Sequence, residues 1–102
     1  MSERRLVLRR KEITIKDGDY TGWMFTGIVN PPLNAIEDLT SSSIERMKKG
    51  LTRIIVAPWN FVDEEGKPMP DPSLDSIGEL PIDLVSAIST AYIAETASLP
   101  PR

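Results

Sequence analysis

Two residue types that carry much of protein chemistry are missing from this sequence. It has no cysteine, which excludes a disulfide framework and a thiolate metal site and fits a reducing cytoplasm. It also has no histidine, so the commonest general base and metal ligand is absent. The three serines at 41–43 lack a base to activate them, and helix capping explains them better. We therefore expect a protein that is not an enzyme and needs no cofactor.

Long apolar segments are also missing. No run of about 18 apolar residues occurs, so no transmembrane helix is expected. Residues 1–10 contain four arginines and lack the apolar centre of a signal peptide. These features predict a soluble intracellular protein with no membrane partner.

The charges that are present are unevenly spread along the 102 residues. Residues 1–16 hold six basic and two acidic side chains, whereas residues 63–102 hold two basic and eight acidic ones. Such a chain can associate head to tail with another copy or with a charged partner, although solvated ends explain the same pattern. The net charge of −3 disfavours a nucleic-acid partner, despite the N-terminal arginines.

The length predicts one domain, with residues 1–5 and 97–102 frayed. Apolar residues alternate loosely from Leu6 to Ile15, and residues 20–29 are rich in aromatic and β-branched types. Asp17-Gly18-Asp19 between them has the composition of a turn. We predict an N-terminal antiparallel β-hairpin.

Helical patterns follow the hairpin. The sequence predicts a short helix over residues 33–39, a basic amphipathic helix over 44–55 and a final helix from Leu80 to Tyr92, with an ordered loop at 71–78. Ser42 and Glu45 have the spacing of a capping box for the second helix. The apolar stripe of the second helix comprises Ile44, Met47, Leu51, Ile54 and Ile55. That of the final helix comprises Leu84, Val85, Ile88, Ala91 and Tyr92. The expected class is α+β, with the two main helices joined by a short Trp-Asn-Phe β/turn segment.

That joining segment runs from Trp59 to Pro70. Its acidic residues lack EF-hand spacing, since Phe61 and Pro72 occupy two ligand positions, so we expect a solvated turn and no metal. Trp59 and Phe61 stand two residues apart and should point to one face, into the core, with Asn60 free to bond a neighbouring backbone. We predict a structural clasp made of Trp59, Asn60, Phe61, Gly66, Pro68 and Pro70.

The layout resembles a family of small phage proteins. The residues that carry the resemblance are Tyr20-x-Gly22-Trp23, Asn30-Pro31-Pro32, the Trp59 to Pro70 segment and Leu80-Pro81-Ile82-Asp83-Leu84. Over residues 6–93 this pattern is similar to tail assembly chaperones of long-tailed bacteriophages and prophages. The resemblance implies a non-enzymatic protein that binds the tape measure protein and helps tail tube subunits assemble around it. It also implies location in the cytoplasm of the bacterial host and absence from the mature virion.

A chaperone for a helical client needs an exposed apolar groove, and methionine adapts well to varied partners. We expect the client surface to include Met24, Met47 and Met69 together with Trp23 and Phe25. Two other functions remain open at this point. One is a structural head–tail joining or minor tail protein, and the other is a small nucleic-acid-binding regulator that uses the N-terminal arginines.

Overall fold

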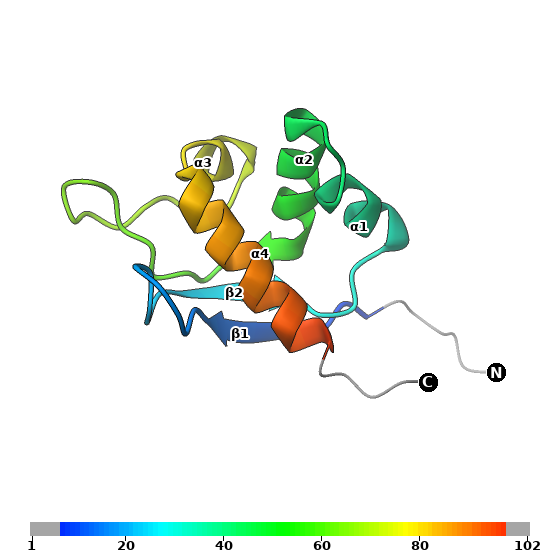
Figure 1. The fold of residues 1–102 in the computed structure, drawn as a ribbon, viewed down its shortest axis with the longest axis horizontal. Helices are drawn as coiled ribbons and strands as arrows, with labels where there is room; N and C mark the ends of the chain where they lie inside the picture. The colour runs from blue at the N-terminus through cyan, green and yellow to red at the C-terminus, as the bar shows by residue number, and fades with distance from the viewer. Residues whose placement is uncertain (1–6, 98–102) are drawn as a thin grey trace.

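The computed structural model describes residues 7–97 and confirms the α+β class. Three antiparallel strands, β1 (Arg10–Thr14), β2 (Met24–Ile28) and β3 (Ile55–Val56), form a sheet in the order β1-β2-β3. The helices are α1 (Leu33–Leu39), α2 (Ile44–Ile54), α3 (Leu74–Gly78) and α4 (Ile82–Ala97). Figure 1 shows the helices gathered on one side of the sheet. The ends predicted to fray lie outside the described residues, except for Ala97, which ends α4.

The predicted hairpin is present, with shorter strands than expected. Ile13 is paired with Phe25, and the ladder extends past the strand ends because the Ile15 amide donates to the Trp23 carbonyl at 2.8 Å. Residues 20–22 belong to the connecting turn, where Gly18 and Gly22 have φ values of 87° and 91°. Glycine adopts these positive angles without steric cost, so the turn occupies residues that the composition placed in a strand.

β1 is an edge strand, and β2 lies at the centre of the sheet. The inter-strand bonds at Arg9 and Ile15 place the backbone groups of Arg10, Glu12 and Thr14 on the outer edge of β1. Ile13 and Ile15 are buried, while the intervening residues are exposed. The predicted alternation is therefore confirmed at Ile13 and Ile15, but not at Leu8, which is 40% exposed and lies before the strand.

α4 packs closely on the sheet. The Tyr92 hydroxyl donates to the Ile28 carbonyl at 2.7 Å. A Cβ atom on Gly27 would lie 3.0 Å from the Ile13 Cδ1 atom and 3.3 Å from the Tyr92 Cδ1 atom, so a larger residue would force these two side chains to shift. The predicted apolar stripe of this helix is confirmed: four of its five members are buried and Ala91 is half-buried.

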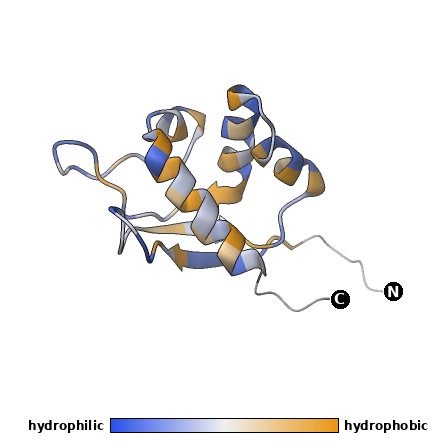
Figure 2. Ribbon diagram, viewed as in Figure 1, coloured by the Kyte–Doolittle hydropathy of each residue, from blue (hydrophilic) through white to orange (hydrophobic). Residues whose placement is uncertain are grey.

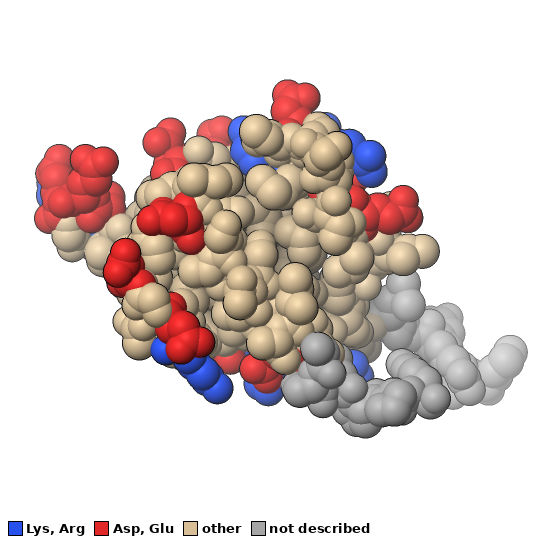
Figure 3. Space-filling model, viewed as in Figure 1, with Lys and Arg blue, Asp and Glu red and all other residues tan. Residues whose placement is uncertain are grey.

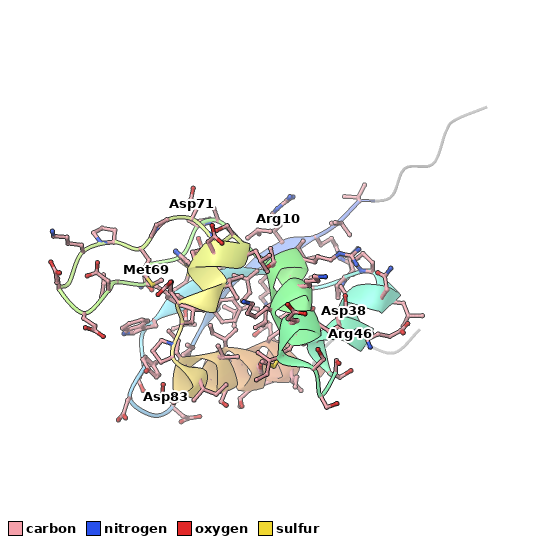
Figure 4. All side chains as sticks on the ribbon, turned by 90° about the horizontal axis from the view of Figure 1, so that it is seen from above. Arg10, Asp38, Arg46, Met69, Asp71 and Asp83 are labelled. Atoms are coloured by element: carbon pink, nitrogen blue, oxygen red, sulfur yellow. The ribbon has the colours of Figure 1, made fainter. Side chains whose placement is uncertain are left out.

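α1 and α2 form a tight helical pair. Their closest approach is at the buried Gly50, where an added Cβ would lie 2.5 Å from the Leu39 amide nitrogen. Arg46 and Asp38 join the two helices by an ion pair at 3.0 Å (Figure 4). The glycine in α2 thus allows the two backbones to meet.

α2 starts at Ile44, as predicted, but its capping residue was placed one position too early. Ser43, not Ser42, is the N-cap, and its hydroxyl accepts from the Arg46 amide. The Ser42–Glu45 capping box was therefore wrong, because any of three consecutive serines offers the same side chain. Ile44 is 69% exposed, so its place on the apolar stripe was also wrong: it is the first helical residue and lies outside the α2 face that packs on the core.

α3 replaces part of the predicted loop at 71–78. Ser73 and Ser76 cap each other, since each side chain bonds the other's backbone amide, and Ile77 is buried. Five helical residues are too few to show a helical repeat. α2 in turn ends at Ile54, one residue earlier than predicted, because Ile55 pairs with Gly27 in the sheet.

The apolar residues of the sheet, of α2 and α4 and of the joining segment share one core. Figure 2 shows apolar colour on the inner sides of the helices, whereas the side of α4 that faces the viewer is mostly near-white. Between Leu84 and Ala94, α4 carries no charged residue. No helix among residues 7–97 has both the length and the apolar character needed to cross a bilayer.

Candidate functional site: an aromatic groove with an acidic rim

Four aromatic rings form a continuous row beside the start of α4. Tyr20 meets Trp23 edge to face with ring centroids 5.0 Å apart, and Trp23 meets Phe61 at 5.4 Å. Phe61 then stacks on Trp59 at 4.5 Å, with an angle of 24° between the rings. Phe61 is 1% exposed, whereas Trp23 and Trp59 are half-buried. The row therefore passes through the core at Phe61 and reaches the surface at both ends.

The backbone that carries Phe61 is tied to β2 through Asn60. The Asn60 backbone amide donates to the Met24 carbonyl at 3.0 Å, and the Asn60 side-chain Oδ1 atom accepts from the Met24 backbone amide at 2.7 Å. Its Nδ2 atom donates to the Gly22 carbonyl at 3.4 Å. The predicted bonding of Asn60 to a neighbouring backbone is present, and it continues the sheet past the end of β3.

A hairpin at residues 61–69 forms one wall of the site. The Met69 amide donates to the Phe61 carbonyl at 3.0 Å, and Val62 forms an antiparallel bridge with Pro68. At the tip, Gly66 has a φ of 81°, and the Asp63 Oδ1 atom accepts from the amides of Glu65 and Lys67. The predicted solvated turn is confirmed, since residues 62–68 are all exposed. The second proline of the segment, Pro70, accepts a hydrogen bond from the Trp59 indole at 3.1 Å.

The opposite wall comes from the start of α4. The Tyr20 hydroxyl donates to the Asp83 Oδ1 atom at 2.8 Å, and this hydrogen bond raises the pKa of Tyr20, because ionisation would break it. The same Asp83 atom accepts from the Leu84 amide at 2.9 Å. The hydrogen bond to Asp83 thus fixes the outer aromatic ring against the helix.

Between these walls lies a hollow of about 450 Å³, which we call the aromatic groove. Its apolar lining comes from three separated segments, and four carboxylates stand among its lining residues. The complete lining consists of Tyr20, Trp23, Val62, Asp63, Glu64, Glu65, Met69, Glu79, Pro81 and Leu84. Figure 3 shows acidic residues gathered at the hairpin end of the molecule, beside an uncharged face. A groove of this kind suits an apolar segment that carries positive charge.

The structure separates the residues predicted to form a client surface. Trp23 and Met69 both line the aromatic groove. Met24 and Met47 are half-buried at other places, in β2 and α2. Phe25 was a wrong choice, because it is 0% exposed and faces the core opposite Ile13.

The groove also contains residues that were not predicted as partner contacts. The sequence placed Tyr20 in a strand, Glu79 and Pro81 at the start of the final helix, and Asp63 to Glu65 in a turn. The high acidic content after residue 62 was the one available signal, and it does not show which carboxylates share a face.

A second hollow, of about 360 Å³, lies between β1 and α4. Ile13 and Ile15 form part of it on the strand side, and Ser86, Thr90 and Ala94 on the helix side. Lys11 and Glu95 form an ion pair between the same two elements, which lowers the pKa of Glu95. This hollow has a mixed lining and no concentration of charge.

Within residues 7–97, no three acidic side chains lie close enough together to hold a metal ion. Comparisons with protein-family models, with curated proteins and with solved structures found no match to this chain.

Proposed function

We propose that this protein is a non-enzymatic tail assembly chaperone-like protein, which binds a segment of a phage tape measure protein. The resemblance of the sequence supports the identity of the client. The observation that carries the binding role is the aromatic groove, an apolar hollow of about 450 Å³ at the surface beside the core.

The groove lining fits a helical or extended segment with apolar side chains. Trp23 and Met69 offer half-buried apolar surface, and Val62 is 37% exposed at the rim. Large aromatic and methionine side chains contribute much of the apolar area at binding sites, and methionine adapts to different partner shapes. The stacked row behind Trp23 supports the groove from the core side.

The proposal includes the other roles implied by the resemblance. The protein brings tail tube subunits to the covered tape measure protein in the host cytoplasm, and it leaves before the virion is complete. Self-association around the client accompanies this role. The uncharged outer side of α4 supports it, because such a face loses little on leaving water.

A binding titration with purified fragments of the tape measure protein from the same phage or prophage tests the proposal. We expect one fragment to bind, and we expect the double variant Val62→Asp with Met69→Gln to weaken that binding about tenfold or more. The matched control is Ile44→Asp, which changes an apolar residue that is more exposed than Val62 and lies outside the groove lining. Equal loss in the control, or no binding by any fragment, would contradict the proposal.

Mass spectrometry of purified virions separates this role from that of a structural tail protein. A chaperone should be absent from finished particles. A stoichiometric amount of this chain in the virion would instead assign it as a head–tail joining or minor tail component.

A further inference from the structure

The aromatic groove has negative charge on its rim and no basic residue in its lining. Asp63, Glu64, Glu65 and Glu79 all line it. The nearest basic side chain along the hairpin, Lys67, lies 3.5 Å from Glu65, and both side chains are more than 70% exposed. Figure 4 shows Arg10 of β1 well apart from Met69 and Asp83, which lie toward the groove end of the molecule.

Two of the four carboxylates are already engaged. Asp63 accepts two backbone amides at the hairpin tip, and Glu65 is within reach of Lys67. Glu64 and Glu79 make no side-chain hydrogen bond or ion pair with any described residue. They belong to different walls of the groove, because Glu64 lies in the hairpin and Glu79 in the segment before α4.

The aromatic rings add a second attraction for a cation. The faces of tyrosine and tryptophan rings carry partial negative charge and attract guanidinium and ammonium groups. Arginine is favoured over lysine at such sites, because its planar group stacks on a ring while its edge bonds a carboxylate. Tyr20 and Trp23 lie in the same lining as the carboxylates, which supplies both components.

We infer that the aromatic groove recognises a basic side chain, preferably arginine, set among apolar residues of the bound segment. This inference rests on the proposed function, because it specifies which feature of the client segment the groove reads. The apolar neighbours of the arginine would cover Val62 and Met69, and its charged group would lie between Glu64 and Glu79.

Two blocked synthetic peptides test the inference without any change to the protein. The first carries one arginine flanked by leucine and alanine, and the second has citrulline in its place, which keeps the shape and removes the charge. We expect the arginine peptide to bind at least about fivefold more tightly. The indole N–H signal of Trp23 in the NMR spectrum should shift more than that of Trp59, which the groove lining does not include.

A double variant, Glu64→Gln with Glu79→Gln, should remove most of the preference for arginine. The matched control is Glu12→Gln with Glu45→Gln, which neutralises two exposed carboxylates outside the groove. Equal affinity for the two peptides, no binding of either, or an equal effect of both double variants would overturn the inference.

The same measurements distinguish this inference from the proposed function. If a tape measure fragment binds equally well after its arginines and lysines are changed to glutamine, the inference fails and the chaperone role stands. If no tape measure fragment binds but the arginine peptide does, the chaperone role fails and the groove keeps its specificity. Self-association that the Glu64 and Glu79 variant abolishes would assign the groove to the basic N-terminal strand of another copy, and would overturn the inference of a client arginine.

Discussion

Asn60 links the joining segment to β2 with its side chain as well as its backbone. Its Oδ1 atom accepts the hydrogen bond from the Met24 backbone amide that a backbone carbonyl would accept in a regular strand. The sheet therefore continues past β3 through an amide side chain, which positions Phe61 behind Trp23. The geometry of the aromatic groove depends on this connection.

Replacing Asn60 by alanine should lower the free energy of unfolding by about 1 kcal/mol, because two hydrogen bonds to the β2 segment are lost. Urea denaturation followed by tryptophan fluorescence measures the change. Asn34→Ala is the control, since among residues 7–97 the Asn34 side chain bonds only the exposed Arg53 side chain, and it should change stability by less than about 0.5 kcal/mol. A larger effect at Asn34 than at Asn60 would contradict the role given to Asn60.

Tyr92 makes the stability of the fold sensitive to alkaline pH. Burial raises the pKa of Tyr92 from its ordinary value of 10.0 to about 12. The folded state thus favours the neutral phenol, and the stability it contributes is complete below pH 10 and is lost as the pH rises from 10 toward 12. A pKa shift of about two units corresponds to about 3 kcal/mol at most.

Urea denaturation at a series of pH values from 8 to 11.5 tests this expectation. Tyr92→Phe should lose about 1 kcal/mol at pH 8, because the bond to Ile28 is missing, and should then lose less stability than the wild type above pH 10. The wild type measured under the same conditions is the reference, because every other titrating group is present in both proteins. Parallel curves for the wild type and Tyr92→Phe would disprove the assignment.

The helical pair α1 and α2 depends on one close backbone contact. Gly50 lies where an added Cβ would approach the Leu39 amide nitrogen at 2.5 Å and the Ala35 carbonyl oxygen at 2.9 Å. Both contacts are with backbone atoms, so the helices would have to move apart.

Gly50→Ala should therefore destabilise the protein by about 2 kcal/mol, although alanine is the better helix former by about 1 kcal/mol. Thermal unfolding followed by circular dichroism measures the effect. Gly78→Ala is the matched control, because its Cβ would meet only the flexible Lys48 side chain at 3.5 Å. Stabilisation by Gly50→Ala would show that the pair is loosely packed.

The elements that were predicted from the sequence have strong local signals. α1 has the predicted bounds, and the apolar stripe of α4 is buried as expected. The errors fall where several residues offer the same chemistry or where an element is too short for a pattern, as at Ser43 and in α3. The aromatic groove could not be predicted, because Tyr20, Met69 and Glu79 meet only after the hairpin and α4 have packed together.

At the scale of the whole molecule, charge and apolar surface are divided between regions. Acidic residues gather around the aromatic groove, whereas β1 carries Arg10 and Lys11. Binding of a basic client segment should therefore weaken several-fold when salt rises from about 0.05 to 0.5 M, because the screening length falls well below 10 Å. Titrations at the two concentrations measure this, and affinity that stays constant would argue for purely apolar contacts.

The charges of β1 have a further consequence for copies of this chain at high concentration. The backbone groups of Arg10, Glu12 and Thr14 form an unpaired outer edge, as none of the described strands lies beyond β1. An edge of this kind is a template for fibre growth when it is flat and apolar. In β1, two of these three residues, Arg10 and Glu12, are charged. Stacking a second edge on it would strip water from both, so the strand that starts the sheet also disfavours aggregation at this edge.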